Sequence, residues 1–561
     1  MLRFVTGIFI IWVLVVPGYA TPRHEAGIAS AHPTATEAGF AILEAGGNAF
    51  DAAVAVSATL AVVEPYSSGL GGGGFWLLQQ AGKAEAVMID GRETAPLKAH
   101  EKMYQNEKGE LVPGLSMDGA LAAGIPGEPA ALVHIAEKYG RLPLSQSLAP
   151  AIRAARQGFA VTPLYKRMAE FRLSALRASK AAAAVFLYRD EVPREGYVIK
   201  QPDLAHTLEA IAKQGAAGFY QGRVGKMLVA ETVKAGGIWT AEDLSGYKVV
   251  ERTPVTGSWH DYRITSAAPP SSGGIAIIEM LNMLENDGLR SLSGVARKHL
   301  LIEAMRRAYR DRAEFLGDPD FVKVPVARLT DKGYARQLRE GIVPSRATPS
   351  RALRPAVPAP EGDHTTHFSI LDSEGNRVAA TLSINYPFGS GFMAEGTGVL
   401  LNDEMDDFSA KPGAPNAYGL VGAQANAIAP GKRMLSSMSP TFVEGPDRLA
   451  IIGTPGGSRI ITMVLQGILA VSEGQLARRI VSQRRFHHQY LPDVVQFENR
   501  AFTAGELIGL QGMGHRVKQL RGNYGNMQIV ILDKARHRVS AASDPRGEGL
   551  AQVKAIKKAH R

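Results

Sequence analysis

The feature that most constrains the fold of this chain is an abrupt change in composition and hydrophobic pattern just before residue 365. Between Gly341 and His364 the sequence carries five prolines among Ala, Ser and Arg and has no periodic apolar face, which predicts an extended, exposed, poorly packed segment. Directly after it, residues 367–372 and 378–384 alternate as strands do, with a turn at 373–376. A flexible segment that leads into a hairpin at a threonine, Thr365, predicts a processing site, although this stretch alone also fits an ordinary interdomain linker.

The N-terminus predicts export. A positively charged start, Met1-Leu2-Arg3, precedes an apolar run over residues 4–16 and small residues at 17–20. The run is short for a membrane span, so we interpret residues 1–20 as a cleaved secretory signal, with an uncleaved anchor as the alternative. We therefore expect an exported protein, periplasmic or secreted. The chain has no cysteine, so its 561 residues must rely on a hydrophobic core instead of disulfides.

Charge and composition argue against a nucleic-acid-binding protein. The formal net charge is +10, with 45% hydrophobic and 21% charged residues, as in an ordinary globular protein. Lys and Arg are dispersed along the chain apart from a short tail at 554–561, whereas nucleic-acid binding needs them gathered beside stacking aromatic residues. We interpret the excess charge as solvated surface.

The region before residue 341 is predicted to be rich in helix. Residues 29–63 predict helix with an Ala-rich packing face, and residues 148–284 are mostly helical in pattern, with a helix start near 240–244 and a turn-rich loop at 268–274. A glycine run at 69–74 precedes an apolar, strand-like stretch at 75–78. A phosphate-binding loop has the reverse order, so this run predicts a tight crossing of backbones.

Short motifs spread along the whole chain resemble those of one enzyme family. Upstream of Thr365 they are Gly46-Gly47-Asn48-Ala49, Asp51-Ala52-Ala53, Gly71 to Phe75 and Asp90-Gly91-Arg92-Glu93-Thr94-Ala95-Pro96. Downstream they are Asn385, Gly389-Ser390-Gly391, Asn402 to Phe408, Leu435 to Pro440, Thr454-Pro455-Gly456-Gly457-Ser458-Arg459 and Ala542 to Arg546. In this order, from about Ala26 to Arg546, they resemble the γ-glutamyltransferase (glutathione hydrolase) family of the N-terminal-nucleophile hydrolase superfamily.

The resemblance implies an α+β fold, a four-layer αββα sandwich made as one precursor and cleaved autocatalytically between His364 and Thr365. A large subunit, residues 21–364 with the Pro-rich linker 341–364 at its end, and a small catalytic subunit, residues 365–561, would then form a heterodimer. Cleavage before a threonine also has a chemical rationale that does not depend on the resemblance. A threonine hydroxyl needs an adjacent base, and cleavage frees an α-amine whose unperturbed pKa is roughly 7.7–8.0.

The resemblance also assigns the catalytic groups around Thr365. The backbone N–H groups of Gly456 and Gly457 are expected to form the oxyanion hole, since glycine permits the close approach that this requires. Ser383, where the family commonly has threonine, is expected to hydrogen-bond the Thr365 hydroxyl. Without the resemblance, residues 455–457 would be interpreted only as a turn.

A γ-glutamyl group carries a free α-carboxylate and a free α-ammonium, so its pocket must complement both charges. The resemblance assigns the carboxylate to Arg92, Ser436 and Ser437 and the ammonium to Glu404, Asp407 and the Asn385 side-chain carbonyl. Residues 411–419 resemble a lid loop with Tyr418 as the lid side chain. No cofactor and no metal is expected. The expected partners are γ-glutamyl donors such as glutathione and amino-acid, dipeptide or water acceptors.

Several histidines in the sequence favour structural roles, and other functions also fit parts of the chain. His367 and the adjacent pair His487-His488 are interpreted as packing or hydrogen-bonding residues, because neighbours in sequence do not converge on one ion. Tyr386-Pro387 departs from the family's small hydroxyl residues and leaves acceptor preference open. The alternatives are a cephalosporin or glutaryl acylase of the same fold, which would not need both Glu404 and Asp407; an exported solute-binding protein, which would stay one chain; and a catalytically dead homologue.

Overall fold

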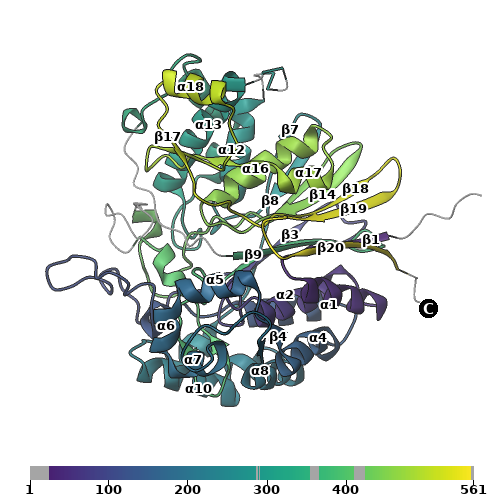
Figure 1. Cartoon of the computed structure of the whole chain (residues 1–561), viewed down its shortest axis with the longest axis vertical. Coiled ribbons are helices and arrows are strands. Elements are labelled where there is room, and N and C mark those ends of the chain that lie inside the picture. Colours follow the sequence, from purple (N-terminus) through teal and green to yellow (C-terminus); the bar gives the residue numbers. More distant parts are fainter. Residues whose placement is uncertain are drawn as a thin grey trace, which may run out of the picture.

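The computed structural model describes residues 25–285, 288–289, 291–292, 294–353, 365–409 and 424–556. Two β-sheets lie face to face in the centre, with one layer of helices below them and another above (Figure 1). This is the α+β, four-layer αββα sandwich that the family resemblance implied, and the fold class is confirmed.

The first central sheet has seven strands in the order β20-β1-β9-β10-β2-β3-β6. Their bounds are β20 Leu550–Ala555, β1 Glu25–Ser30, β9 Thr365–Leu371, β10 Arg377–Ser383, β2 Gly73–Gln79, β3 Val87–Gly91 and β6 Val250–Arg252. Every recorded pairing in it is antiparallel. Strand β9, which begins at Thr365, therefore lies inside the sheet, with β1 and β20 on one side and β10 and β2 on the other.

The second central sheet has six strands in the order β19-β18-β14-β13-β8-β7. They are β19 Arg538–Ser543, β18 Gln528–Asp533, β14 Arg448–Gly453, β13 Thr441–Glu444, β8 Tyr262–Ser266 and β7 Val255–Trp259. Smaller sheets are formed by β4 Phe159–Ala160 with β5 Val198–Ile199, by β11 Met393–Ala394 with β12 Val399–Leu400, and by β15 Phe486–His487, β16 Val495–Phe497 and β17 Val517–Gln519.

Helices cover the outer faces of both sheets. Those between β1 and β6 are α1 Pro33–Glu44, α2 Ala49–Val63, α3 Glu128–Tyr139, α4 Leu144–Gln157, α5 Pro163–Phe171, α6 Leu173–Ala178, α7 Lys180–Phe186, α8 Pro202–Gln214, α9 Ala217–Tyr220, α10 Gly222–Lys234 and α11 Ala241–Gly246. The later ones are α12 Gly273–Leu284, α13 Gly294–Phe315, α14 Val326–Leu329, α15 Lys332–Glu340, α16 Arg459–Ser472, α17 Ala477–Ser482 and α18 Ala504–Gly512. Short 3₁₀ turns are η1 Ala120–Ala122, η2 Ser350–Ala352, η3 Glu404–Asp407 and η4 Gln424–Asn426.

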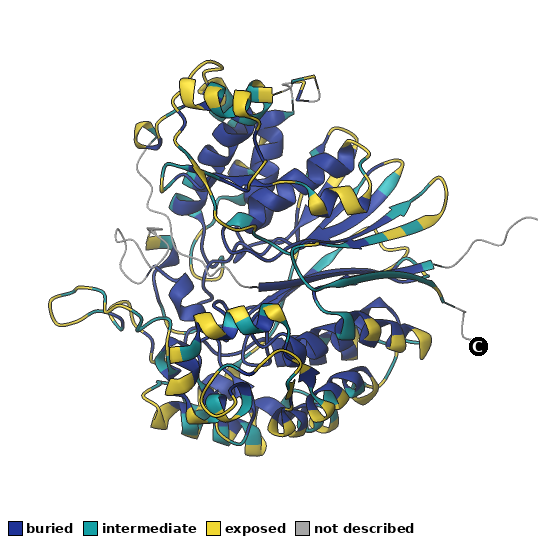
Figure 2. Ribbon diagram, viewed as in Figure 1, coloured by how far each residue is buried: buried dark blue, intermediate teal, exposed yellow. Residues whose placement is uncertain are grey.

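The alternation of β9 decides which residues face which layer. Phe368 and Ile370 pack in the core shared with α1 and α2, whereas Leu371 packs in the core between the sheets and the upper helices. His367 and Ser369 point toward the second sheet, since Ser369 Oγ donates to the Gln528 carbonyl of β18 at 3.2 Å. Because side chains alternate along a strand, Thr365 shares this inward direction with His367. Figure 2 shows the strands and the inner helix faces buried and the outer helix faces exposed.

The glycine run before β2 forms the predicted tight crossing. A Cβ atom placed on Gly71 would lie 2.0 Å from the Leu400 carbonyl oxygen, and one on Gly72 would lie 2.2 Å from that of Ser383. Cβ atoms on Gly73 and Gly74 would lie 2.4 Å and 2.5 Å from the carbonyl oxygens of Gly91 and Thr381. Glycine is therefore required wherever this segment runs against β3, β10 and β12.

Most of the predicted elements are present, and three predictions need correction. The strands at 367–372 and 378–384 are β9 and β10, and the helix start near 240–244 is α11, capped by Thr240 and Asp243. Residues 29–30 are not helical, because they end β1, which pairs with both β9 and β20. Residues 148–284 are mostly helical, but they also contain β4, β5, β6, β7 and β8, which the helical pattern did not predict.

The third correction concerns the Pro-rich segment, of which 341–353 is described. It is not simply extended and exposed: Ile342, Ala347 and Ser350 are buried, and hydrogen bonds tie it to α13. Arg307 of α13 donates to the Leu338 and Gly341 carbonyls, and Glu303 accepts from the Thr348 N–H. The prediction for 354–364 lies outside the described residues.

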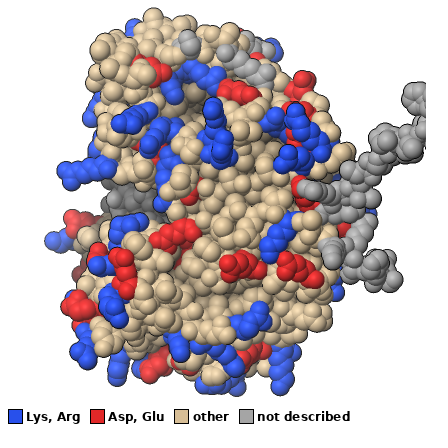
Figure 3. Space-filling view, turned by 45° about the vertical axis from the view of Figure 1, so that its right-hand side comes forward, with Lys and Arg blue, Asp and Glu red and all other residues tan. Residues whose placement is uncertain are grey.

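Charged residues are distributed as the composition suggested. On the face in Figure 3, Lys and Arg side chains are scattered among acidic and uncharged ones. Within the described part of the chain, no helix is both long and apolar enough to cross a bilayer.

Candidate active site

Thr365 occupies the first position of β9, at the end of the central hairpin. Its Cα partner across the ladder is Ser383, the last residue of β10, and both side chains are buried, with 6% and 4% of their surface exposed. Ser383 Oγ accepts the Asn385 N–H at 2.8 Å, which fixes the serine side chain against the turn that follows β10. The two hydroxyl residues therefore lie side by side on the inner face of the first sheet.

The Gly456–Gly457 turn lies between β14 and α16 and faces this hairpin end. Both glycines have positive φ, 137° and 54°, a region that favours glycine. Neither N–H donates a hydrogen bond to any described residue. Both N–H groups precede the first turn of α16, whose dipole favours negative charge at that end. The turn therefore has the free donors and the position that an oxyanion hole requires, although its role stays a prediction.

A buried charge cluster lies deeper in the same site. The two terminal nitrogens of Arg92 contact Glu404 at 2.6 Å and Asp407 at 2.5 Å, and Glu93 lies 3.4 Å from the guanidinium. All four side chains are at most 5% exposed. The family resemblance assigned the guanidinium and the two acids to opposite ends of a substrate, whereas the structure pairs them with one another.

Burial and crowding of like charges shift the pKa values in this cluster. Burial and repulsion from Glu404 raise the pKa of Asp407 well above its usual range, although Arg92 opposes that shift. Burial and the same neighbour also raise the pKa of Glu93. For Arg92, burial lowers the pKa but the surrounding carboxylates outweigh burial and raise it, so the guanidinium stays charged. One fixed cation thus sits among three acids that compete for it.

The remaining predicted binding residues surround this cluster. The Ser436 backbone is held by the loop before α12, donating to the Pro270 carbonyl at 2.9 Å and accepting from the Ser272 N–H at 2.7 Å. Ser437 Oγ is buried without a hydrogen-bond partner among the described residues, so it is free to donate to a ligand. Asn385 has a positive φ of 74°, and its amide donates to the Asp403 carbonyl at 2.9 Å.

Most of the predicted site residues line one small cavity of about 10 Å³, about the room that one water molecule needs. These are Arg92, Thr365, Ser383, Asn385, Glu404, Asp407, Ser436, Ser437 and Gly457. Gly456 lines a second, larger cavity that also reaches Thr365. Tyr418, the predicted lid residue, lies outside the described residues.

Sequence reasoning missed the residues that hold η3 in place. Asn402 accepts the Glu404 N–H through its Oδ1 and donates to the carbonyls of Gly71 and Gly124, which anchors the acidic turn to the glycine crossing. Asn426 donates to the Asp407 carbonyl and accepts from the Leu435 N–H, which links the acids to the serine pair. Asn402 is part of a quoted motif, but nothing in the sequence indicates these partners.

The histidines singled out in the sequence have structural roles, as interpreted. His367 is buried between the sheets and hydrogen-bonds Thr381 at 2.8 Å, and burial lowers its pKa to about 3. His487 bonds Thr462 and Gln489, while His488 bonds Asp493. Burial keeps both imidazoles neutral, with pKa values lowered to about 3 and about 4.

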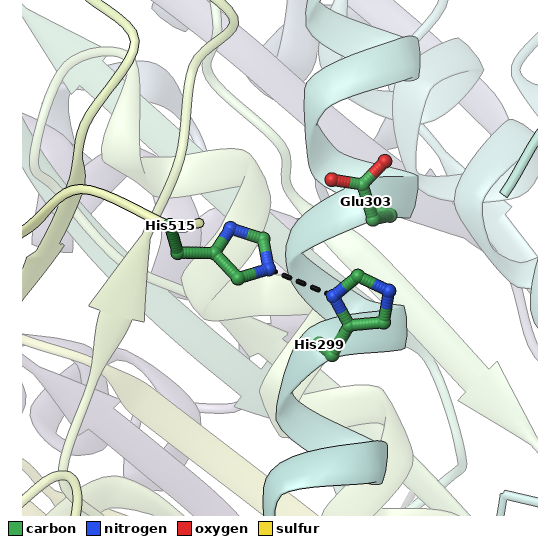
Figure 4. A group of neighbouring side chains, drawn as sticks. All are labelled: His299, Glu303 and His515. Carbon is green, nitrogen blue, oxygen red and sulfur yellow. Dashed lines mark hydrogen bonds between the residues drawn. The ribbon is translucent and has the colours of Figure 1, made fainter. Parts of the chain in front are cut away.

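Three side chains of the types that bind metal ions lie close together, away from the candidate active site. They are His299 and Glu303 of α13, which face His515 (Figure 4). His299 bonds His515 at 2.7 Å and the Val343 carbonyl at 3.0 Å. Glu303 is already bound by the guanidinium groups of Arg306 and Arg307. Because both His299 nitrogens have partners and two cations lie beside the Glu303 carboxylate, the group suits anchoring of residues 341–353 better than holding a divalent ion.

Comparisons with known proteins agree with this arrangement. The chain is 42% identical over 525 residues to the glutathione hydrolase proenzyme of Escherichia coli K12, covering 92% of this chain and 90% of that protein. It superposes on a cephalosporin acylase from Bacillus halodurans with a TM-score of 0.83 at 27% identity, covering 98% and 100% of the two chains. A gamma-glutamyltranspeptidase from Helicobacter pylori matches with a TM-score of 0.57 at 42% identity, covering 58% of this chain and 94% of that one. The family model for gamma-glutamyltranspeptidase matches residues 35–553, and the chain belongs to this family of enzymes.

Proposed function

We propose that this enzyme cuts itself before Thr365 and then uses that threonine to hydrolyse or transfer γ-glutamyl amides, glutathione among them. The observation that carries the proposal is the position of Thr365. It begins a central strand beside Ser383 and lines one cavity with a buried guanidinium, two carboxylates and a serine pair. The relatives named glutathione hydrolase proenzyme support both the substrate and the processing.

In the proposed maturation step, the Thr365 hydroxyl attacks the preceding carbonyl and the ester that forms is hydrolysed. This leaves the α-amine of Thr365 free and gives a large subunit, 21–364, paired with a small one, 365–561. Strand β1 of the large subunit pairs with β9 and β20 of the small one, and β2 pairs with β10, so the two subunits would stay joined by hydrogen bonds within one sheet after cleavage. A core divided between two chains in this way is typical of obligate complexes, which supports the proposed heterodimer.

In the proposed turnover, the amine takes the hydroxyl proton as Thr365 Oγ attacks the γ-carbonyl of the substrate. The negative charge that develops on the carbonyl oxygen would lie at the Gly456–Gly457 N–H groups. The amine product leaves, and water or an acceptor amine then attacks the γ-glutamyl ester on Thr365. The same threonine therefore serves both reactions.

The charge cluster suits a zwitterionic headgroup. A γ-glutamyl group brings one carboxylate and one ammonium. Its carboxylate can replace Glu404 and Asp407 as the partner of Arg92, while its ammonium pairs with these two acids. The exchange keeps every buried charge compensated, which matters because an unpaired buried charge costs several kcal/mol, roughly 3–5. A substrate with only a carboxylate would leave Glu404 and Asp407 uncompensated.

A glutaryl or cephalosporin acylase remains the second candidate, because the structural likeness to a cephalosporin acylase spans the whole chain. The two acids beside Arg92 favour the γ-glutamyl substrate, since a glutaryl group has no ammonium to offer them. The two candidates therefore differ by one functional group on the substrate.

The deciding experiment compares L-γ-glutamyl-p-nitroanilide with glutaryl-p-nitroanilide, with Thr365→Ala as the control. We expect chromophore release from the γ-glutamyl compound at a kcat/KM at least about 100-fold higher, as two charge-assisted contacts would produce. Adding glycylglycine as an acceptor amine distinguishes transfer from hydrolysis. Equal rates with the two anilides would contradict the proposed specificity.

We propose in addition that the protein is exported and that residues 1–20 are its signal, from the apolar run and small residues near the N-terminus. Sequencing the N-terminus of the large subunit from cells that express the full chain tests this. A start at Thr21 is expected, and retention of Met1 would contradict cleavage.

A further inference from the structure

Two side chains of α13 contact the segments that carry the candidate active site. Helix α13 packs on α12 in the upper helix layer (Figure 1). Tyr309 and Arg312 lie three residues apart on α13, a spacing that places both on one face of the helix, and they are 3% and 2% exposed. Neither is among the described residues that line the two cavities at Thr365. Any effect on the chemistry must therefore pass through the residues that they hold.

Tyr309 holds the end of the predicted oxyanion turn. Its hydroxyl donates a hydrogen bond to the carbonyl of Ser458, which follows Gly457 and is the N-cap of α16. The first two N–H groups of α16 donate to the Gly456 and Gly457 carbonyls at 3.1 Å and 3.0 Å. The turn and the helix therefore form one hydrogen-bonded unit, and a shift of Ser458 would move the two glycine N–H groups with it.

A second buried contact also holds Ser458. Its hydroxyl donates to Gln489 Oε1 at 2.8 Å, and the same oxygen bonds His487 Nε2 at 2.7 Å. The Tyr309 ring packs edge-on against the His487 ring, with centroids 5.5 Å apart. Burial raises the pKa of Tyr309, so its hydroxyl stays a donor at neutral pH. Tyr309, Gln489 and His487 thus form one connected support for the oxyanion turn.

Arg312 contacts a different segment, the one that supports the serine pair Ser436 and Ser437. Its Nε donates to Ser272 Oγ at 2.9 Å, and both the Oγ and the N–H of Ser272 donate to the Ser436 carbonyl at 2.7 Å. That carbonyl belongs to the planar peptide that joins Ser436 to Ser437, so fixing it orients both serines. Burial lowers the pKa of Arg312 to about 10, which nearby groups, Asp407 among them, oppose, and the guanidinium stays charged at neutral pH.

We propose that α13 positions two parts of the site separately, with Tyr309 setting the oxyanion turn and Arg312 setting the serine pair that binds the substrate carboxylate. The inference rests on the proposed function and adds two positioning residues to it. The turn stabilises charge that develops only in the transition state, whereas the serines hold the carboxylate before and during the reaction. Loss of the first contact should therefore lower kcat, and loss of the second should raise KM.

Two anilides that differ in one group separate these roles. L-γ-Glutamyl-p-nitroanilide carries the α-carboxylate, and 4-aminobutyryl-p-nitroanilide has the same amide and ammonium without it. The ratio of their kcat/KM values measures how much the carboxylate contributes to binding of the transition state. A general disturbance of α13 would change kcat and KM together and would act on both anilides alike.

Tyr309→Phe keeps the ring and removes only the donor. We expect kcat of the cleaved enzyme to fall about tenfold with both anilides, while KM stays within about twofold of the parent's value and the ratio is unchanged. Tyr262→Phe, which removes a hydroxyl that donates to Asp447 at 2.9 Å, is the matched control and should keep parental kinetics.

Arg312→Lys keeps the charge but loses the Nε–H that Ser272 accepts. We expect KM for the γ-glutamyl anilide to rise about tenfold with kcat near the parent's value, and the ratio of the two anilides to shrink by about the same factor. Arg310→Lys makes the same substitution on the same helix, at a guanidinium paired with Asp311 and Glu314, and should keep the parent's KM and ratio.

A parental kcat in Tyr309→Phe, the parent's ratio in Arg312→Lys, or equal changes of kcat and KM in both variants would overturn the inference. Where a variant fails to fold, Gln489→Met, which removes the other contact of Ser458, and Ser272→Ala, which removes the hydroxyl that Arg312 binds, carry the same tests. A parent enzyme that is inactive on both anilides would instead overturn the proposed function.

Discussion

Ser383 lies directly opposite Thr365 where the β9–β10 hairpin opens, and its hydroxyl is fixed by the Asn385 N–H at 2.8 Å. This relationship gives the site a hydroxyl beside the nucleophile before any amine is free. During maturation Thr365 is still acylated at its nitrogen, so only its neighbours can orient its hydroxyl. During turnover the freed amine shares that task.

Ser383→Ala should therefore slow maturation more than turnover, and Ser383→Thr should preserve both. The measurement pairs the rate of precursor loss on a denaturing gel with the turnover of the fraction already cleaved. Equal losses in the two rates would mean that both reactions depend on Ser383 alike, contrary to this account.

Arg92→Lys keeps the positive charge but loses the fork that contacts Glu404 and Asp407. We expect kcat/KM for γ-glutamyl amides to fall by about 10- to 1,000-fold, in line with the loss of charge-assisted hydrogen bonds. Self-cleavage should continue, because no γ-glutamyl group takes part in it, and this serves as the folding control. Arrest of self-cleavage would instead assign Arg92 to the folding of the site.

Gly456→Ala tests the oxyanion turn. The Met463 Cε atom that the new Cβ would meet at 2.7 Å can move aside, but a φ of 137° is strained for alanine, so we expect the turn to shift and its N–H groups with it. We expect kcat of the cleaved fraction to fall by about 100- to 1,000-fold with little change in KM, as for loss of an oxyanion donor. Gly505→Ala, where a Cβ meets nothing within 4 Å, is the matched control and should keep parental kinetics. A loss confined to KM would place the turn outside the chemistry.

The local part of this structure could be predicted from the sequence. Alternation over 367–384 predicts the hairpin, because a hairpin depends on residues close together in the chain. The glycine run predicts a tight crossing of backbones but not its partners, since Ser383 and Leu400 lie more than 300 residues away in the chain. The packing of residues 341–353 on α13 could not be predicted, since their partners Glu303 and Arg307 lie some forty residues upstream in the chain and no local pattern identifies them.

The same distinction applies to the candidate site. Motifs indicate Arg92, Glu404 and Asp407 as binding residues, but their mutual ion pairs join segments more than 300 residues apart. The second cavity depends even more on the fold. Glu64, Arg167 and Tyr524 come from three distant segments, and each reads alone as an ordinary polar residue. They line one cavity with Thr365 only because the fold brings these segments together.

The mass and N-terminal sequence of the chains in the purified protein test the central claim most directly. The account predicts a small chain of 197 residues, 365 through 561, that begins with Thr365, and a Thr365→Ala variant that stays uncut. A small chain that begins at any other residue, or an intact parent chain that still turns over γ-glutamyl amides, would contradict it.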